Sequence, residues 1–158
     1  METEIRRMAA AEYPLLDEFL YQAIFVPKGA GAPPREIINQ PDLQIYVQNF
    51  GQQEGDCCLV GDCGGKVVGA VWVRIMDDYG HIDDETPSFA ISILPEYRGQ
   101  GIGTRLMKAM LELLKSEGFE RASLAVQKEN YAVKMYRSCG FETVGENEQE
   151  YIMVCKLR

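Results

Sequence analysis

The chain has 158 residues, of which 46% are hydrophobic and 25% are charged. This length and composition predict one globular domain, residues 1–158, and argue against extended disorder. The net charge of −8 disfavours nucleic acid and anionic membranes as partners, because both require a basic surface. Without a long apolar run or a signal-type N-terminus, the sequence predicts a soluble, cytoplasmic protein.

The five cysteines are an odd number, which predicts reduced thiols and not a disulfide framework. Cys57, Cys58 and Cys63 lie close together and raise the question of a zinc site. No second pair of cysteines or histidines follows at zinc-ligand spacing, and the single histidine is His81. We therefore expect buried strand thiols and no metal.

Hydrophobic patterning organises the N-terminal part of the chain. Residues 12–24 place apolar side chains on one helical face, whereas residues 26–34 are rich in glycine and proline and predict a loop. Residues 66–75 are almost wholly apolar, which is typical of a central strand. The predicted elements are a strand over 5–8, helices over 12–24, 35–39 and 41–49, and strands over 56–60, 66–75 and 88–94.

The C-terminal part begins with an amphipathic helix that runs from Ile102 to Leu114 and is closed by Gly118. A strand over 122–126, a helix over 130–139 and a hairpin over 142–145 and 151–157 follow. This order predicts a mixed α/β domain with one βαβ crossover around the long helix. Such a crossover makes its flanking strands parallel and places a ligand at their ends.

The segment between the strand at 88–94 and the long helix carries the strongest signal. It contains Arg98, Gly99, Gln100, Gly101, Ile102, Gly103 and Thr104. Glycines let the backbone approach a ligand closely, and the free amides and dipole of the following helix attract an anion. The segment therefore predicts a pyrophosphate cradle, to which Arg98 and Arg105 can add charge.

Two common nucleotide motifs do not fit this segment. The dinucleotide fingerprint requires another glycine spacing and an acidic residue after the next strand, where this chain has Gln127 and Lys128. The phosphate-binding loop requires a lysine between its last glycine and the Ser or Thr, and Gly103 is followed directly by Thr104.

The pattern Arg98-x-x-Gly101-x-Gly103 after a strand resembles the acetyl-CoA signature of the GNAT N-acetyltransferases. The resemblance implies a single domain with a central, mixed, mostly antiparallel sheet of about seven strands and helices on both faces. It implies acetyl-CoA as co-substrate, with its pyrophosphate on residues 98–104. Main-chain groups near Ile93 and Leu94 would pair with the pantetheine arm, and an amide near Ile93 would hold the thioester oxygen.

A second motif extends this resemblance to residues 89–141. It reads Asn130-x-Ala132-x-x-x-Tyr136-x-x-x-Gly140-Phe141 and resembles the family's second conserved segment. Asn130 has two interpretations, a helix cap or a bond to pantetheine. Tyr136 is either a core tyrosine or the acid that protonates the thiolate leaving group, and the paired motifs favour the acid.

The resemblance implies direct attack by a neutral amine through a tetrahedral intermediate. Cys139 lies near Tyr136 in sequence, but no histidine neighbours it, and an inert thiol is the stronger interpretation. For the general base, Glu85 is the first candidate, followed by the other ionisable residues of its loop, Asp83, Asp84 and His81. A merely solvated loop explains these residues as well.

The sequence thus predicts an N-acetyltransferase that acts on a primary amine of a small molecule, a peptide N-terminus or a lysine. Two alternatives stay open: a coenzyme-binding sensor without turnover, and an enzyme with another acyl group or acceptor. The family resemblance would make a homodimer unsurprising. In the family the first helices shape the acceptor pocket, and candidates for its walls, or for core packing, are Tyr21, Phe25, Tyr46 and Phe50.

Overall fold

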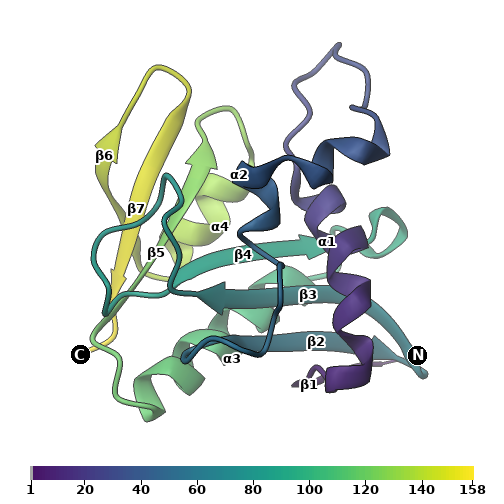
Figure 1. Cartoon of the computed structure of the whole chain (residues 1–158), viewed down its shortest axis with the longest axis horizontal. Helices are drawn as coiled ribbons and strands as arrows, with labels where there is room; N and C mark the ends of the chain where they lie inside the picture. Colours follow the sequence, from purple (N-terminus) through teal and green to yellow (C-terminus); the bar gives the residue numbers. More distant parts are fainter. Residues whose placement is uncertain (1) are drawn as a thin grey trace.

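A computed structural model describes residues 2–158 and shows an open sheet of seven strands in the order β1-β2-β3-β4-β5-β7-β6 (Figure 1). All neighbouring strands are antiparallel except β4 and β5. This confirms the mixed, mostly antiparallel sheet with one parallel crossover. The strands are β1 (Thr3–Arg7), β2 (Cys57–Cys63), β3 (Lys66–Arg74), β4 (Ser88–Ile93), β5 (Arg121–Gln127), β6 (Phe141–Glu146) and β7 (Glu150–Lys156).

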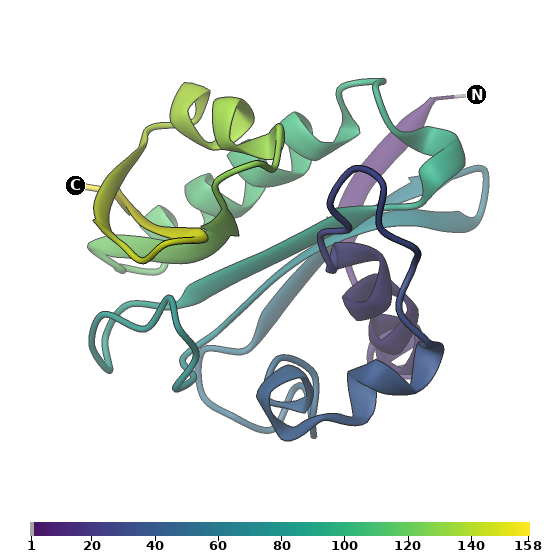
Figure 2. The same cartoon turned by 90° about the horizontal axis from the view of Figure 1, so that it is seen from above.

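Helices cover both faces of the sheet, as Figure 2 shows from above, with α1 and α2 on one side and α3 and α4 on the other. Within residues 2–158, none of the helices combines the length and apolarity needed to cross a membrane. The α-helices are α1 (Leu16–Ala23), α2 (Pro41–Gln44), α3 (Ile102–Ser116) and α4 (Ala132–Ser138), and the 3-10 helices are η1 (Ala10–Leu15), η2 (Arg35–Asn39) and η3 (Pro95–Tyr97).

The sheet separates two hydrophobic cores because successive side chains of a strand point to opposite faces. Val71 and Val73 of β3 pack with Leu106 of α3, whereas Trp72 packs with Phe19 of α1. All four β3 residues from Ala70 to Val73 are fully buried, which confirms the prediction of a central strand. The sheet is therefore fixed from both sides, and α3 is held firmly over β2, β3 and β4.

Three predicted elements differ most in extent. The helix expected over 12–24 is split into η1, which contains Pro14, and α1; proline disfavours the α conformation of the residue before it. The helix expected over 41–49 ends at Gln44, and Asn49 adopts a left-handed φ of 54°. Strand β2 runs to Cys63, beyond the predicted Val60, because the hairpin turn is confined to Gly64 and Gly65.

A buried ion pair ties the segment after α2 to the sheet. Arg74 and Asp56 are each 1% exposed, and two guanidinium nitrogens of Arg74 donate to the Asp56 carboxylate at 2.9 and 2.8 Å. The third nitrogen donates to the carbonyls of Ile45 and Gln48 at 3.0 and 2.7 Å. Each of the three guanidinium nitrogens thus donates to at least one acceptor, and the cost of burying the charge is offset.

We expect Asp56→Asn to lower the free energy of unfolding by about 3–5 kcal/mol, because it leaves the Arg74 charge buried and uncompensated. Urea titration followed by circular dichroism measures this loss. Glu18→Gln is the matched control, because Glu18 and Arg35 form an exposed ion pair whose loss costs less than about 1 kcal/mol. Equal losses in the two variants would contradict the structural role of Arg74.

Candidate functional site

The site begins where β4 and β5 separate. The two parallel strands share one registered pair, Ser88 with Ser123, and the Ser123 amide donates to the Pro87 carbonyl at 3.0 Å. Beyond that point β4 stays paired with β3 and β5 stays paired with β7. Because main-chain groups alternate between the two edges of a strand, those of Ile91 and Ile93 face the resulting gap.

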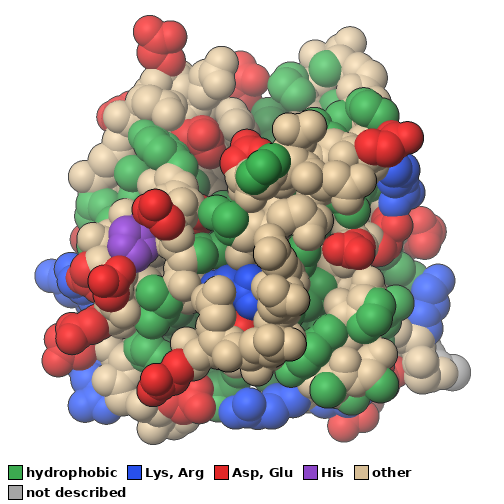
Figure 3. Space-filling model, in the orientation of Figure 1, with side chains coloured by type: hydrophobic (Ala, Val, Ile, Leu, Met, Phe, Trp, Pro, Cys, Tyr) green, Lys and Arg blue, Asp and Glu red, His purple; other side chains and the backbone are tan. Residues whose placement is uncertain are grey.

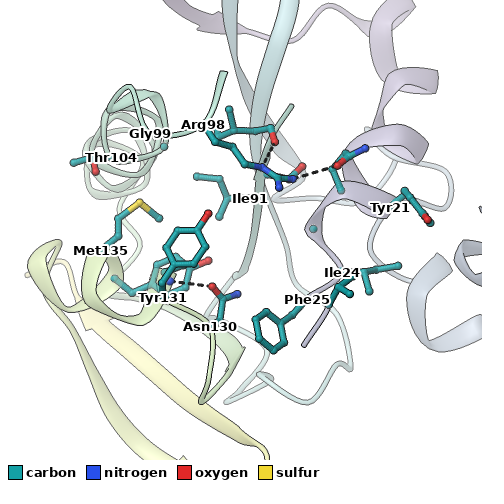
Figure 4. Close-up of a pocket in the computed structure, with 18 of the residues that line it drawn as sticks. Tyr21, Ile24, Phe25, Ile91, Arg98, Gly99, Thr104, Asn130, Tyr131 and Met135 are labelled. Atoms are coloured by element: carbon teal, nitrogen blue, oxygen red, sulfur yellow. Dashed lines mark hydrogen bonds between the residues drawn. The ribbon is translucent and has the colours of Figure 1, made fainter. Parts of the chain in front are cut away.

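A cavity of about 510 Å³ occupies this gap. Its walls come from the end of α1 and the following loop, the end of β4, the first turn of α3 and the start of α4 (Figure 4). The predicted motifs around Arg98 and Asn130 therefore meet in one cavity, although about thirty residues separate them in the chain. Cys139, the alternative nucleophile, does not line it.

Two of the turn's glycines supply backbone conformations that other residues resist. Gly99 has a φ of 76° and Gly101 a φ of 83°, and a Cβ at either position would meet nothing within 4 Å. Glycine is therefore required by the left-handed backbone and not by crowding. Gly101 caps α3 without a side-chain bond, and the first helical bond runs from the Arg105 amide to the Gly101 carbonyl at 3.2 Å.

This geometry leaves the amides of Ile102, Gly103 and Thr104 outside the helical ladder. They lie at the positive end of a helix of 15 residues, beside the cavity. Free amides and a helix dipole together form a cradle that fits a pyrophosphate.

The third glycine has a different physical reason. A Cβ on Gly103 would lie 3.3 Å from the Met135 sulfur and 3.9 Å from Cγ1 of Ile93. Gly103 therefore lets α4 and β4 approach the first turn of α3 closely. The contact brings the two sequence motifs together and sets the width of the cavity between them.

Arg98 fixes the turn against its neighbours. Its Nε donates to the Ile93 carbonyl at 2.9 Å and its Nη2 to Gln22 of α1 at 3.2 Å. Figure 4 shows both bonds at the edge of the cavity. Arg105, by contrast, donates to the Thr3 carbonyl at 2.8 Å and does not line the cavity, so the charge expected from it is directed elsewhere.

Asn130 lies in the wall between Tyr131 and Phe25 (Figure 4). Its side-chain oxygen accepts the Ala132 amide at 2.9 Å and so stabilises the start of α4. The bond closes a short turn before α4, whose N-cap position is Tyr131 and has no side-chain cap. Because one lone pair and the amide nitrogen remain, the residue can also bind a ligand in the cavity.

Tyr136 lies on α4 and is 8% exposed, with its ring packed edge-on against Phe141 at 6.1 Å. Its hydroxyl makes no hydrogen bond within residues 2–158, yet in that range every fully buried side-chain nitrogen or oxygen has a partner. The hydroxyl is therefore accessible, and Tyr136 lines the cavity. Burial raises the pKa of Tyr136, so the group keeps its proton at neutral pH.

Three residues of the predicted coenzyme site do not present side chains to the cavity. The Leu94 amide donates to Val68 at 2.9 Å and its carbonyl accepts from Tyr97 at 2.9 Å, so its main chain is already engaged. Gln100 is exposed, and the Ile102 side chain is buried in the core. Ile93 and Leu94 are the two residues predicted to pair with pantetheine, and the structure brings Ile93 but not Leu94 to the cavity.

The candidates for the general base lie elsewhere. Glu85 lines a second cavity with Thr86 and Arg121, beside the beginning of β4, whereas the anion cradle lies near the end of β4. Asp83 accepts bonds from Thr86 and pairs with Arg121, and this holds the loop. The structure therefore does not bring Glu85 and Tyr136 together. The second cavity also contains Asp84, whose carboxylate lies 3.4 Å from the ring of His81.

Another carboxylate of this loop, Asp78, turns inward, and its residue type alone does not distinguish it from its solvated neighbours. Asp78 accepts the hydroxyls of Tyr46 at 2.9 Å and Ser88 at 3.0 Å. Burial raises the pKa of Asp78. Of the predicted wall residues, Tyr21 and Phe25 line the cavity, whereas Tyr46 and Phe50 do not. Local patterns cannot make this distinction, because it depends on how the loop folds over the sheet.

The fold and the cavity define an α/β domain with an anion cradle at the open end of a parallel strand pair. The model of the acetyltransferase (GNAT) family matches residues 20–141, so the chain belongs to the GNAT family. It is 26% identical to human N-acetyltransferase 8B over 71% of this chain and 50% of that protein. It is 30% identical to mycothiol acetyltransferase of Thermobifida fusca over 72% of this chain and 36% of that protein.

The chain thus spans about half the length of these curated relatives, or less. Solved structures show the same fold over nearly the whole chain. PaiA N-acetyltransferase from Thermoplasma acidophilum, in complex with coenzyme A, has a TM-score of 0.72 at 18% identity and covers 99% of both chains. The ribosomal-protein-S18-alanine N-acetyltransferase of Escherichia coli has a TM-score of 0.68 at 17% identity, covering 98% of this chain and 94% of that one.

We expect Gly101→Ala to weaken coenzyme A binding about tenfold, because a left-handed φ costs alanine about 1–2 kcal/mol and relaxation would turn the free amides away. Isothermal titration calorimetry measures the dissociation constant. Gly65→Ala is the matched control, with a φ of 95° and no atom within 4 Å in the β2–β3 turn. Equal binding by both variants would contradict the cradle.

Proposed function

We propose that this chain transfers an acetyl group from acetyl-CoA to a primary amine. Membership of the GNAT family supports the reaction class, and the meeting of the glycine turn with Tyr136 in one cavity supports it for this chain. The free amides of α3 would hold the pyrophosphate, and Arg98 would add positive charge beside them. The pantetheine arm would lie along the open edge of β4 at Ile91 and Ile93.

The observation that carries the proposal is the Tyr136 hydroxyl. It is accessible and makes no hydrogen bond within residues 2–158, although the ring that bears it is buried. A core tyrosine satisfies its hydroxyl locally. A hydroxyl directed into a cavity between the two coenzyme motifs instead fits a proton donor to the leaving group. Its raised pKa keeps the proton in place until charge develops on sulfur.

The reaction then proceeds without an acyl-enzyme. The neutral amine nitrogen attacks the thioester carbon, and a main-chain amide near Ile93 stabilises the oxyanion. The carbon–sulfur bond breaks, and the thiolate takes the proton of Tyr136. The proton that the nitrogen loses returns to the tyrosine oxygen through solvent. Glu85 is not part of this proposal, because it lies beside the other end of β4.

The proposal is tested by coenzyme binding and by thiol release. We expect acetyl-CoA to bind in a calorimetric titration, and the purified chain to release free thiol from acetyl-CoA when amines are added. Binding without thiol release across the amine panel would favour a coenzyme sensor. Absence of binding would end the proposal, because the cradle would then have no coenzyme to hold.

We expect Tyr136→Phe to lower kcat by about 10²–10³-fold, since it removes the acid while keeping the ring that packs on Phe141. Coenzyme affinity should stay within about twofold by calorimetry, because the cradle is unchanged. Tyr13→Phe is the control, because the Tyr13 ring packs on Phe50 away from the cavity. A variant Tyr136→Phe with full kcat would assign this tyrosine to packing alone.

A further inference from the structure

The wall of the cavity that faces away from the coenzyme cradle is apolar. It is built from the residues that follow α1, among them Ile24, Phe25, Val26 and Pro33. Across the cavity lies Tyr131, which is 78% exposed, and Val26 is 39% exposed. Figure 4 shows Phe25 and Tyr131 coming from different walls, with Asn130 between them. Large apolar side chains that stay exposed at the mouth of a cavity indicate contact with a ligand.

The apolar wall is held in place before a ligand binds. The Tyr21 hydroxyl donates to the Pro33 carbonyl at 2.5 Å, and this closes the loop back onto α1. The Arg35 guanidinium lies over the Tyr21 ring, 4.2 Å from its centroid, and pairs with Glu18. Joining the end of the loop to α1 limits how far this wall can move, which favours selection of the group beside the reacting nitrogen.

The charge around the cavity selects the protonation state of the amine. Of the residues 2–158, those lining the cavity include one charged side chain, the cation Arg98. The inward carboxylate of Asp78 is held by Tyr46 and Ser88, outside this lining. Figure 3 shows acidic side chains spread over the face that carries α1 and α2 and not gathered in one patch. Apolar walls disfavour an ammonium ion, because they replace water around the charge without supplying a counter-charge.

Amines differ widely in the fraction of molecules that is neutral at a given pH. An α-amino group has a pKa of about 7.7–8.0 and a lysine side chain one of about 10.4, so the neutral fraction near pH 7.5 differs on the order of 10²-fold. The lining of this cavity therefore favours an α-amino group over a lysine side chain. The α-carbon that bears this amino group also carries the side chain of the same residue. The ring pair of Phe25 and Tyr131 fits an apolar side chain at that position.

On the basis of the proposed acetyl transfer, we propose that the acceptor is the α-amino group of an amino-acid unit with an apolar side chain, and that this side chain packs between Phe25 and Tyr131. The same chemistry is offered by a peptide N-terminus and by a small amino-acid amide. The polycationic amines and lysine side chains are disfavoured by the same walls.

The test compares initial rates of thiol release at pH 7.5 with saturating acetyl-CoA. The acceptors are a tripeptide amide that begins with leucine, a triglycine amide, leucinamide, Nα-acetyl-lysine amide and spermidine. We expect kcat/KM for the leucine peptide or leucinamide to exceed that for the lysine amide on the order of 10²-fold. A higher value for the peptide identifies a peptide N-terminus as the source, and a higher value for leucinamide identifies a small molecule.

Variants of the wall test where the side chain binds. Phe25→Ala should raise KM for the leucine acceptors about tenfold and leave KM for the triglycine amide within about twofold. Phe25→Leu keeps a large apolar side chain, so its KM for the leucine acceptors should lie close to that of the unchanged protein. Val26→Ala should act in the same direction but more weakly. Val144→Ala, the same truncation of an exposed valine on β6, should leave KM unchanged for the leucine acceptors and for the triglycine amide. Calorimetry with acetyl-CoA checks that the cradle is intact.

The outcomes separate this inference from the proposed function. Faster transfer to the lysine amide or to spermidine overturns the inference and leaves the acetyltransferase intact. An equal effect of Phe25→Ala on the leucine and triglycine acceptors also overturns it. Transfer to none of the amines, with acetyl-CoA bound, overturns both.

Discussion

The site depends on the separation of β4 and β5 after a single registered pair. Because β4 remains paired with β3 and β5 with β7, the gap between them opens without breaking the sheet. The gap exposes main-chain groups of β4 that a closed sheet would consume, and it admits a ligand between two cores that are otherwise packed. The α3 helix lies over this part of the sheet, so its free N-terminal amides face the same opening.

The glycine turn combines two kinds of constraint in one short segment. Gly99 and Gly101 are required by a left-handed backbone, whereas Gly103 is required by its contact with Met135 of α4. The first kind directs the amides of α3 toward the cavity. The second kind brings Tyr136, one residue after Met135, to the same place. The free amides of α3 and the side chain of Tyr136 are therefore brought to one cavity by the packing of two helices.

The two halves of the cavity, proposed to hold the acetyl donor and the amine acceptor, differ in chemistry. Main-chain amides and Arg98 line the donor half, while apolar and aromatic side chains after α1 line the other half. The negative net charge of the chain acts at long range and can attract a cation. In the proposed reaction the apolar walls would favour the neutral form of an amine at short range, so the surface and the cavity would act at different stages of binding.

The sequence by itself determined the order of the strands and helices, the central position of β3 and the turn at 98–104, because periodicity and glycine spacing are local properties. It also indicated Asn130 and Tyr136 through the resemblance to a known family. It could not place Glu85, Leu94 or Arg105, since their surroundings depend on contacts with distant residues. Tertiary structure alone decided that Glu85 lies beside the other end of β4, that Leu94 pairs with Val68, and that Phe25 and Tyr131 share one cavity. The physical reason is that a strand or helix is specified by neighbours in sequence, whereas a cavity is specified by segments that meet only when the sheet and its helices pack.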